Sequence, residues 1–174
     1  MAPAVVRATF ALMPGSLDAI DPVTGVSMRA RRSSLSVPGS SERMLGKAIG
    51  LPVDEVVADL EDSVAADAKE HARELVRAFL AQRRGAGPGI AVRINPLTSP
   101  WGERDVIELV GPAPSLIGSV IVPKVERAAD VAAAQCLLDE LGPQAAGVGV
   151  QALIETASGL GDPDDSARCA AAVG

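Results

Sequence analysis

Residues 55–84 read EVVADLEDSVAADAKEHARELVRAFLAQRR, with an apolar run, an acidic pair and a long amphipathic segment in immediate succession. The run Glu55–Leu60 has the length and composition of a buried strand, and Glu61 and Asp62 close it. From about Ala65 to Arg84 the apolar residues recur at helical spacing with charges between them: Ala68, Ala72, Leu75, Val76, Phe79 and Leu80. The stretch therefore predicts one strand followed by one long helix, with carboxylates at the junction.

The same strand-then-helix pattern occurs on both sides of this unit. Further strands are predicted at 34–37, 90–95, 119–122 and 148–154, and further helices at 41–49, 103–110 and 128–141. Ser40 or Ser41 can cap the first of these helices. Five strands that alternate with four helices are typical of βαβ units and a parallel sheet. Right-handed crossovers curl such a series into a βα-barrel or a doubly wound sheet, and periodicity does not choose between them.

Composition and charge narrow the class of protein. The apolar fraction of the 174 residues is 48% and the aromatic fraction 2%, so the core must consist of Val, Leu, Ile and Ala. A net charge of −6 argues against nucleic acid or an anionic membrane as a partner. No apolar run approaches the ~20 residues of a membrane span, and no signal peptide is evident, so we expect a cytoplasmic protein. Cys136 and Cys169 lack metal-ligand spacing and are expected to be reduced and structural.

Polar residues gather where the predicted strands end. In chain order they are Pro38-Gly39-Ser40, Asp59 to Asp62, Arg93 with Asn95, Pro123-Lys124 and Glu155-Thr156. Strand alternation predicts that Arg93 and Asn95 lie on one face. In a βα-barrel the carboxyl ends of the strands build the active site. Carboxylates and an arginine at that rim would form a site for a metal ion and a carboxylate ligand. The alternative, that charges simply begin where strands leave the core, explains one strand end better than five consecutive ones.

Five segments resemble, in sequence and in order, the HpcH/HpaI aldolase and citrate lyase β-subunit family. They are RRSSLSVPGSSERM (31–44), VVADLEDSVAADAKEHAR (56–73), VRINPLTSPWGERD (92–105), VIVPKVERAADV (120–131) and VQALIETASGL (150–160). Members of this family cleave or form β-hydroxyacyl thioesters such as citryl, citramalyl and malyl thioesters. The resemblance implies a TIM-type (β/α) barrel, a carbon–carbon lyase activity, Mg²⁺ as cofactor, and an acyl thioester and an oxo acid as small-molecule partners.

The resemblance also implies roles for single residues. Arg93 would bind the substrate carboxylate or carbonyl, and Glu155 would be a magnesium ligand, which makes these two the candidate catalytic residues. Arg32 would also touch the substrate. Glu61 and Asp62 would contact the metal through water. Each has a simpler interpretation: an internal ion pair for Arg93, a helix-terminal carboxylate for Glu155 and a solvated basic segment for Arg32.

Other residues in the matched segments carry weaker expectations. Asp59 is expected to be structural and bonded to neighbouring strand ends. Gly39 and Ser40 can let the backbone approach a ligand. Lys124 has either a functional or a structural role, and His71, within the charged pattern of the long helix, is expected to have no catalytic role.

The expected domain organisation is an irregular leader over 1–31 followed by a partial βα-barrel over 32–174. The pattern contains about five of the eight βα units of a barrel. The 174 residues are also fewer than the roughly 250 that a complete barrel usually needs. In the family, a second aspartate ligand and an acid/base residue follow the IET segment. Three possibilities follow. The chain is an active lyase, with the missing parts supplied by another chain or with a metal that accepts one protein carboxylate; it is a truncated, inactive relative; or it is a binding or assembly module. A homo-oligomer, by resemblance a trimer, or a complementing chain is the expected partner.

Overall fold

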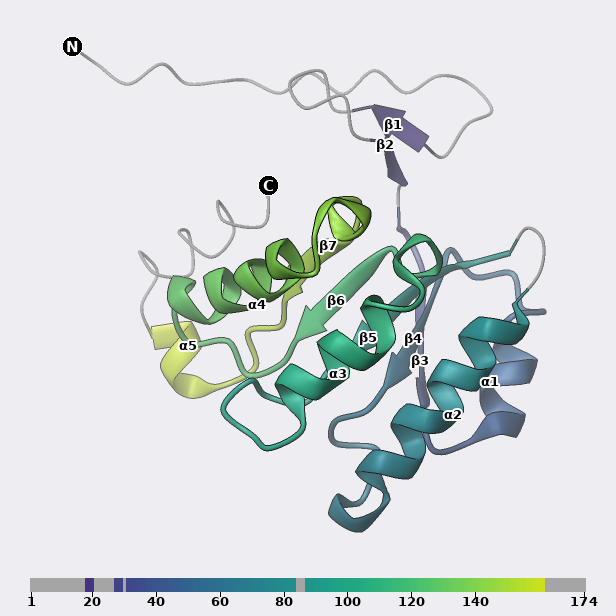
Figure 1. Ribbon diagram of the computed structural model, residues 1–174, viewed down its shortest axis with the longest axis horizontal. Helices are drawn as coiled ribbons and strands as arrows, with labels where there is room; N and C mark the ends of the chain where they lie inside the picture. The colour runs from purple at the N-terminus through teal and green to yellow at the C-terminus, as the bar shows by residue number, and fades with distance from the viewer. Residues whose placement is uncertain (1–17, 21–26, 30, 84–86, 162–174) are drawn as a thin grey trace. The chain divides into compact units, whose positions relative to one another are not determined.

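The computed structural model describes residues 18–20, 27–29, 31–83 and 87–161 (Figure 1). The chain forms two compact units, Met1–Arg32 and Ser33–Gly174. In the N-terminal unit, β1 (Asp18–Ile20) and β2 (Ser27–Arg29) pair antiparallel. The sequence predicted an irregular leader over 1–31, so this short ladder adds a regular element to the predicted picture.

The second unit contains a five-stranded parallel sheet. Its strands are β3 (Ser34–Pro38), β4 (Glu55–Asp59), β5 (Gly89–Arg93), β6 (Ser119–Val122) and β7 (Gly149–Ala152). The helices are α1 (Glu42–Ala48), α2 (Lys69–Gln82), α3 (Gly102–Val110), α4 (Ala128–Glu140) and α5 (Ala157–Gly161). Short 3-10 turns lie at η1 (Ala66–Ala68), η2 (Pro114–Leu116) and η3 (Pro143–Ala145). The five predicted strands and four predicted helices are confirmed, with bounds shifted by a few residues.

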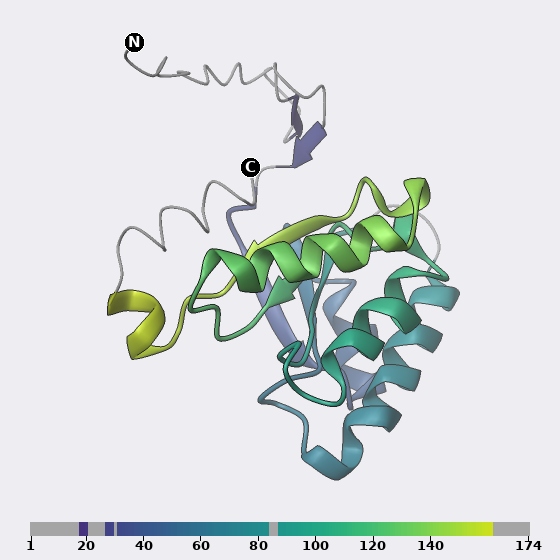
Figure 2. The same ribbon diagram turned by 60° about the vertical axis from the view of Figure 1, so that its left-hand side comes forward.

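The order of the strands decides between the two folds that periodicity left open. The sheet runs β3-β4-β5-β6-β7, so every strand pairs with its successor in the chain. A doubly wound sheet reverses its strand order and carries helices on both faces. Here α1 to α4 cover one face, each contacting the next (Figures 1 and 2). This arrangement is that of consecutive βα units of a TIM-type barrel, and the predicted fold class is confirmed.

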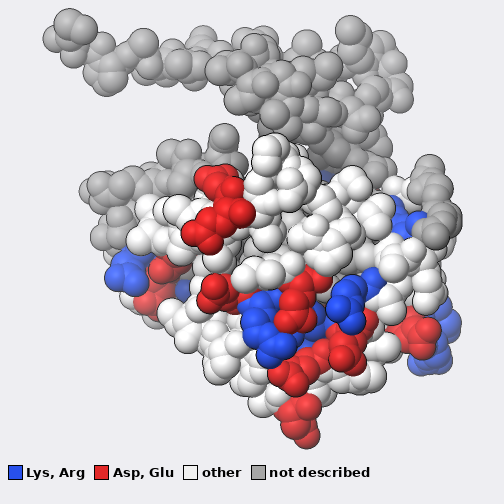
Figure 3. All heavy atoms as spheres, in the orientation of Figure 1, with Lys and Arg blue, Asp and Glu red and all other residues white. Residues whose placement is uncertain are grey.

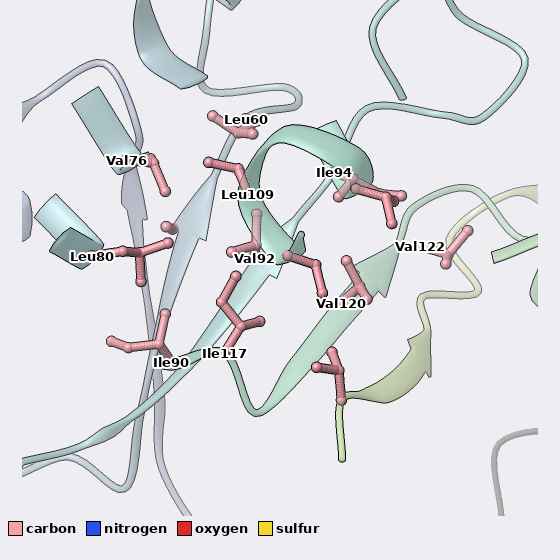
Figure 4. Packing of buried hydrophobic residues seen from close by; sticks show 14 of the residues in the cluster. Leu60, Val76, Leu80, Ile90, Val92, Ile94, Leu109, Ile117, Val120 and Val122 are labelled. Atoms are coloured by element: carbon pink, nitrogen blue, oxygen red, sulfur yellow. The ribbon is translucent and has the colours of Figure 1, made fainter. Parts of the chain in front are cut away.

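The hydrophobic core lies between the sheet and these helices. Leu80 from α2, Leu109 from α3 and Val92 and Val120 from the strands converge there (Figure 4). The largest fully buried side chains are all aliphatic: Leu45, Leu60, Leu80, Ile90, Ile94, Leu109, Ile117, Leu138, Val56, Val76, Val92 and Val106. Each such side chain contributes about 1.5–3 kcal/mol on burial. The aliphatic core expected from the composition is confirmed.

The outer face of the helices is charged but carries paired charges of both signs. Figure 3 shows Lys and Arg beside Asp and Glu over α2 and α3, where Arg104 lies 2.9 Å from Glu70 and 3.0 Å from Glu108. Arg104 is half exposed, and such surface pairs contribute little to stability. In the part of the chain that the structure describes, no helix is long and apolar enough to cross a membrane.

Strand register brings the carboxyl ends of the strands to one edge. Pro38 pairs with Asp59, Asp59 with Arg93, Arg93 with Ile121, and Ile121 with Gln151. The segments that follow these positions therefore leave the sheet side by side. We refer to this edge as the rim: it comprises Asp59, Glu61, Asp62, Arg93, Lys124 and Glu155.

Candidate active site at the carboxyl ends of the strands

An ion pair joins the ends of the adjacent strands β4 and β5 at the rim. Arg93 donates from Nε to Asp59 Oδ1 at 2.7 Å and from Nη2 to Asp59 Oδ2 at 2.6 Å, while its Nη1 lies 3.5 Å from Glu61 Oε2. The Asp59 side chain is 1% exposed and that of Arg93 17%. A two-pronged pair of this kind fixes the guanidinium plane as well as its charge. The expectation that Asp59 is structural and bonded to a neighbouring strand end is confirmed.

The electrostatics of Asp59 follow from opposing contributions. Burial acts to raise the pKa of Asp59, but hydrogen bonds from Arg93, Ser63 and Glu61 outweigh it and hold the pKa below its usual 3.8. The backbone N–H of Glu61 donates to Asp59 Oδ1 at 2.8 Å and that of Ser63 to Oδ2 at 3.3 Å. Asp59 therefore remains a carboxylate that shapes the turn after β4.

Lys124 connects the remaining carboxylates of the rim. Its Nζ forms a short hydrogen bond with Glu61 Oε1 and lies 3.1 Å from Asp62 Oδ1. Its backbone N–H donates to Glu155 Oε1 at 3.2 Å. The hydrogen bonds to Glu61 and Asp62 raise the pKa of Lys124, and the bond from Lys124 lowers the pKa of Asp62. The segments after β4, β6 and β7 thus meet at one residue.

A second lysine is buried and bonds to the backbone that carries part of the rim. Lys69, the first residue of α2, is 8% exposed, and its Nζ donates to the carbonyl oxygens of Leu60 at 2.8 Å and Glu61 at 2.6 Å. Nζ also lies 5.9 Å from the centroid of the Trp101 ring. Burial lowers the pKa of Lys69 against the attraction of the surrounding carboxylates. Lys69 therefore fixes the backbone that presents Glu61.

Asn95 belongs to a different network. Its backbone N–H and its Nδ2 donate to Asp105 Oδ2 at 2.9 and 2.7 Å, and Arg73 Nε donates to Asp105 Oδ1 at 2.8 Å. Strand alternation predicted that Arg93 and Asn95 share a face. That prediction is wrong because β5 ends at Arg93, after which the chain turns to meet α3.

The structure brings four of the five predicted site residues together. Arg93, Glu61, Asp62 and Glu155 lie on the rim and are connected through Lys124 and direct contacts. Arg32 ends the N-terminal unit, two residues before β3 begins, whereas the rim follows the ends of the strands. The expected substrate contact of Arg32 therefore stays a prediction. His71 is exposed on α2, 3.9 Å from Glu74, away from these contacts.

The donor chemistry of the rim fits magnesium. Glu155 is an exposed carboxylate connected to the acidic pair through Lys124, and Mg²⁺ usually takes one or two carboxylates together with waters and substrate oxygens. Within the described residues, no group of three or more His, Cys, Asp and Glu side chains is arranged to hold a metal by itself. Glu61 and Asp62 share the Lys124 ammonium, whereas Glu155 accepts the backbone N–H of Lys124 at Oε1.

Sequence reasoning did not single out Lys69, although a signal was present. Position 69 falls on the same helical face as Ala72, Val76 and Leu80, three, seven and eleven residues later, all of which are buried. A lysine on an apolar face next to a strand end indicates a buried cation with backbone partners. Lys124 was noted in its segment, but its links to three carboxylates depend on contacts between distant segments and have no local signal.

Comparison with known proteins identifies the family. The model of the HpcH/HpaI aldolase/citrate lyase family matches residues 32–172. A (3S)-malyl-CoA thioesterase of Cereibacter sphaeroides (strain KD131) is 39% identical over 129 residues, which are 74% of this chain and 42% of that protein. An L-malyl-CoA/beta-methylmalyl-CoA lyase of Rhodobacter capsulatus is 33% identical over 143 residues, 80% of this chain and 45% of that protein. The chain thus spans less than half the length of these curated relatives.

Solved structures agree with this assignment. The citrate lyase β subunit of M. tuberculosis, complexed with oxaloacetate and magnesium, superposes with a TM-score of 0.60 at 32% identity, covering 83% of this chain and 56% of that one. A malate synthase of Haloferax volcanii has a TM-score of 0.61 at 18% identity over 80% of this chain and 49% of that one, and shares the fold. The resemblance seen in the five segments is confirmed, and the chain belongs to the HpcH/HpaI aldolase/citrate lyase family.

Proposed function

We propose that this chain provides the magnesium- and oxo-acid-binding part of a carbon–carbon lyase that acts on a β-hydroxyacyl-CoA such as malyl-CoA. The observation that carries the proposal is the convergence of Arg93, Glu155 and the Glu61–Asp62 pair on one rim. Family membership supports it, because a 33% identical relative is a malyl-CoA lyase and a 32% identical citrate lyase β subunit is complexed with oxaloacetate and magnesium.

Arg93 would bind the carboxylate or the developing oxyanion of the substrate. Asp59 engages Nε and one N–H of Nη2, and Nη1 lies 3.5 Å from Glu61 Oε2. Since the side chain retains 17% exposure, the second N–H of Nη2 and one N–H of Nη1 can be offered to a ligand. The pair with Asp59 keeps the guanidinium from rotating, which holds these donors in place before the substrate arrives.

Glu155 would hold the magnesium ion, with Glu61 and Asp62 accepting hydrogen bonds from its water ligands. When bound, the metal would supply Lewis-acid polarisation of the oxygen that becomes a carbonyl. In the lyase reaction a general base takes the hydroxyl proton, the bond between the hydroxyl-bearing carbon and the thioester α-carbon breaks, and negative charge passes to the thioester enolate, which is then protonated. The Arg93 guanidinium would stabilise that charge.

Thioester hydrolysis is the second candidate function. It is favoured by the 39% identity to a malyl-CoA thioesterase. The two reactions begin from the same substrate but break different bonds: hydrolysis breaks the C–S bond with water and frees the thiol, whereas the lyase leaves the thiol esterified. Binding without turnover, as in an assembly module, is the alternative to both.

The products of malyl-CoA distinguish these functions. The purified chain is incubated with malyl-CoA and Mg²⁺, and oxo acid is followed as its phenylhydrazone while free thiol is followed with a disulfide reagent. The proposal predicts oxo acid without an equivalent of thiol, and loss of the product in Glu155→Gln but not in Glu140→Gln, a control in an exposed glutamate of α4. Formation of thiol without oxo acid would assign hydrolysis. If neither thiol nor oxo acid forms, both activities are contradicted for this chain.

A further inference from the structure

Lys124 has an unusual backbone conformation. Its φ is +53°, and among the described residues it is the one non-glycine residue with positive φ. L-residues avoid this left-handed region because Cβ crowds the following carbonyl oxygen, and such residues persist only where their surroundings impose the conformation. Its occurrence at the rim therefore calls for a physical reason.

Neighbouring backbone hydrogen bonds hold the segment on both sides of Lys124. Leu153 N–H donates to the carbonyl of Val122 at 2.9 Å, and Val125 N–H donates to the carbonyl of Leu153 at 3.1 Å. Residues 122 and 125 are thus both attached to the residue that follows β7. In a regular parallel ladder the N–H of Lys124 would bond to Leu153, but here the N–H of Val125 does so. One extra residue therefore lies between the two bonds, as in a β-bulge, and the left-handed Lys124 accommodates it.

This conformation directs two donors of one residue to carboxylates from different segments. The backbone N–H points to Glu155, 31 residues later, and Nζ to Asp62 and Glu61, 62 and 63 residues earlier. The Glu61 side chain is 4% exposed and that of Lys124 is 43% exposed, so the ammonium is anchored at its buried partner. The strained backbone and the anchored side chain support each other.

We propose that Lys124 is a positioning residue for Glu155, a claim that rests on the proposed magnesium-binding role of that carboxylate. The left-handed backbone presents its N–H to Oε1, and the ammonium, held by Glu61 and Asp62, keeps the backbone there. Within the described residues Glu155 has no other hydrogen bond or ion pair, so Oε2 would be the oxygen available to a metal ion. The role belongs to the backbone conformation, and the side chain serves to maintain it.

Variants at position 124 separate backbone conformation from charge. Lys124→Gly, Lys124→Asn and Lys124→Val all lack the ammonium, but Gly and Asn tolerate positive φ whereas β-branched Val does not. Mn²⁺ serves as a probe of the magnesium site, and its binding is followed by electron paramagnetic resonance. The Lys124→Gly and Lys124→Asn variants should bind Mn²⁺ with the same affinity as each other. The Lys124→Val variant should bind Mn²⁺ about tenfold more weakly than the Gly and Asn variants. Equal Mn²⁺ affinity in all three would overturn the proposal.

A second measurement needs no metal. In the metal-free chain, Glu155→Ala should shift the amide resonance of Lys124, while Glu140→Ala should leave it in place. An unchanged Lys124 amide in Glu155→Ala would mean that the hydrogen bond is absent and would overturn the positioning role. If wild type binds no Mn²⁺, the proposed function fails and the amide resonance alone decides the role of Lys124. If Lys124→Val does not fold, the amide test with the position-155 variant decides it.

Discussion

At the scale of single residues, the most consequential contact is the two-pronged bond between Arg93 and Asp59. The sequence predicted a structural Asp59 and a substrate-binding Arg93, and the structure joins them directly. The internal ion pair that was the simpler interpretation of Arg93 is therefore present, and the proposed substrate role would use the donors that remain. Which carboxylate faces which guanidinium depends on strand order and register, and no motif states these.

The pair makes a stability prediction. Arg93→Met leaves Asp59 as a buried carboxylate without its partner, and should lower the free energy of unfolding by about 3–5 kcal/mol. Urea unfolding measures this. Arg77→Met, at an exposed position on α2, serves as the control and should change stability little. Equal effects of the two substitutions would show that the bond to Asp59 contributes nothing.

Asp59 also predicts a pH dependence. Its pKa is lower in the folded chain than the usual 3.8, so the folded state holds the carboxylate charged where the unfolded chain binds a proton. The resulting stability is complete above about pH 3.8 and is lost as the pH falls through the lower, folded pKa. The free energy of unfolding, measured from pH 5 down to about pH 2, should therefore fall less steeply in Asp59→Asn than in wild type. Parallel pH profiles would contradict this.

At the scale of elements, the junctions between strands and helices are closely packed, and this packing positions the rim. Gly39 follows β3, and its N–H donates to the carbonyl of Asp59 at 2.7 Å. A Cβ there would lie 2.8 Å from Leu60 Cδ2 and 2.9 Å from Asp59 O. The sequence predicted that glycine lets the backbone approach a ligand at this point, whereas the contacts of Gly39 in the structure are with the end of β4.

Gly39→Ala should accordingly destabilise the chain by about 1–3 kcal/mol through overpacking. Gly46 in α1 provides a matched control, since a Cβ there meets nothing within 4 Å. Gly46→Ala should stabilise by about 0.5–1 kcal/mol because alanine favours the helix. Thermal unfolding of both variants tests this, and a stabilising Gly39→Ala would refute the account of the junction.

The buried Lys69 gives a prediction for the start of α2. Lys69→Met leaves the carbonyl oxygens of Leu60 and Glu61 without their donor and should cost about 2 kcal/mol in the free energy of unfolding. Lys47→Met, on the exposed side of α1, is the control. A loss no larger than that of the control would mean that water satisfies these carbonyls as well as the ammonium does.

At the scale of the whole molecule, periodicity predicted the elements, and only their spatial order separated a barrel from a doubly wound sheet. Alternating βα units were readable because aliphatic runs and helical spacing are local properties. The one-way order β3 to β7 is a property of long-range pairing, and the motifs predicted it only through the family they resemble. The predicted convergence of Glu61, Asp62, Arg93 and Glu155 follows from that order, while Lys69 and Lys124 depend on tertiary contacts.

Calorimetric titration of Mg²⁺ into the metal-free chain, with oxaloacetate present, tests the proposal that the rim binds magnesium through Glu155. Wild type and Glu140→Gln should bind the ion with the same affinity, and Glu155→Gln should bind it at least about tenfold more weakly. Unchanged affinity in Glu155→Gln, or no binding by wild type, would contradict the account.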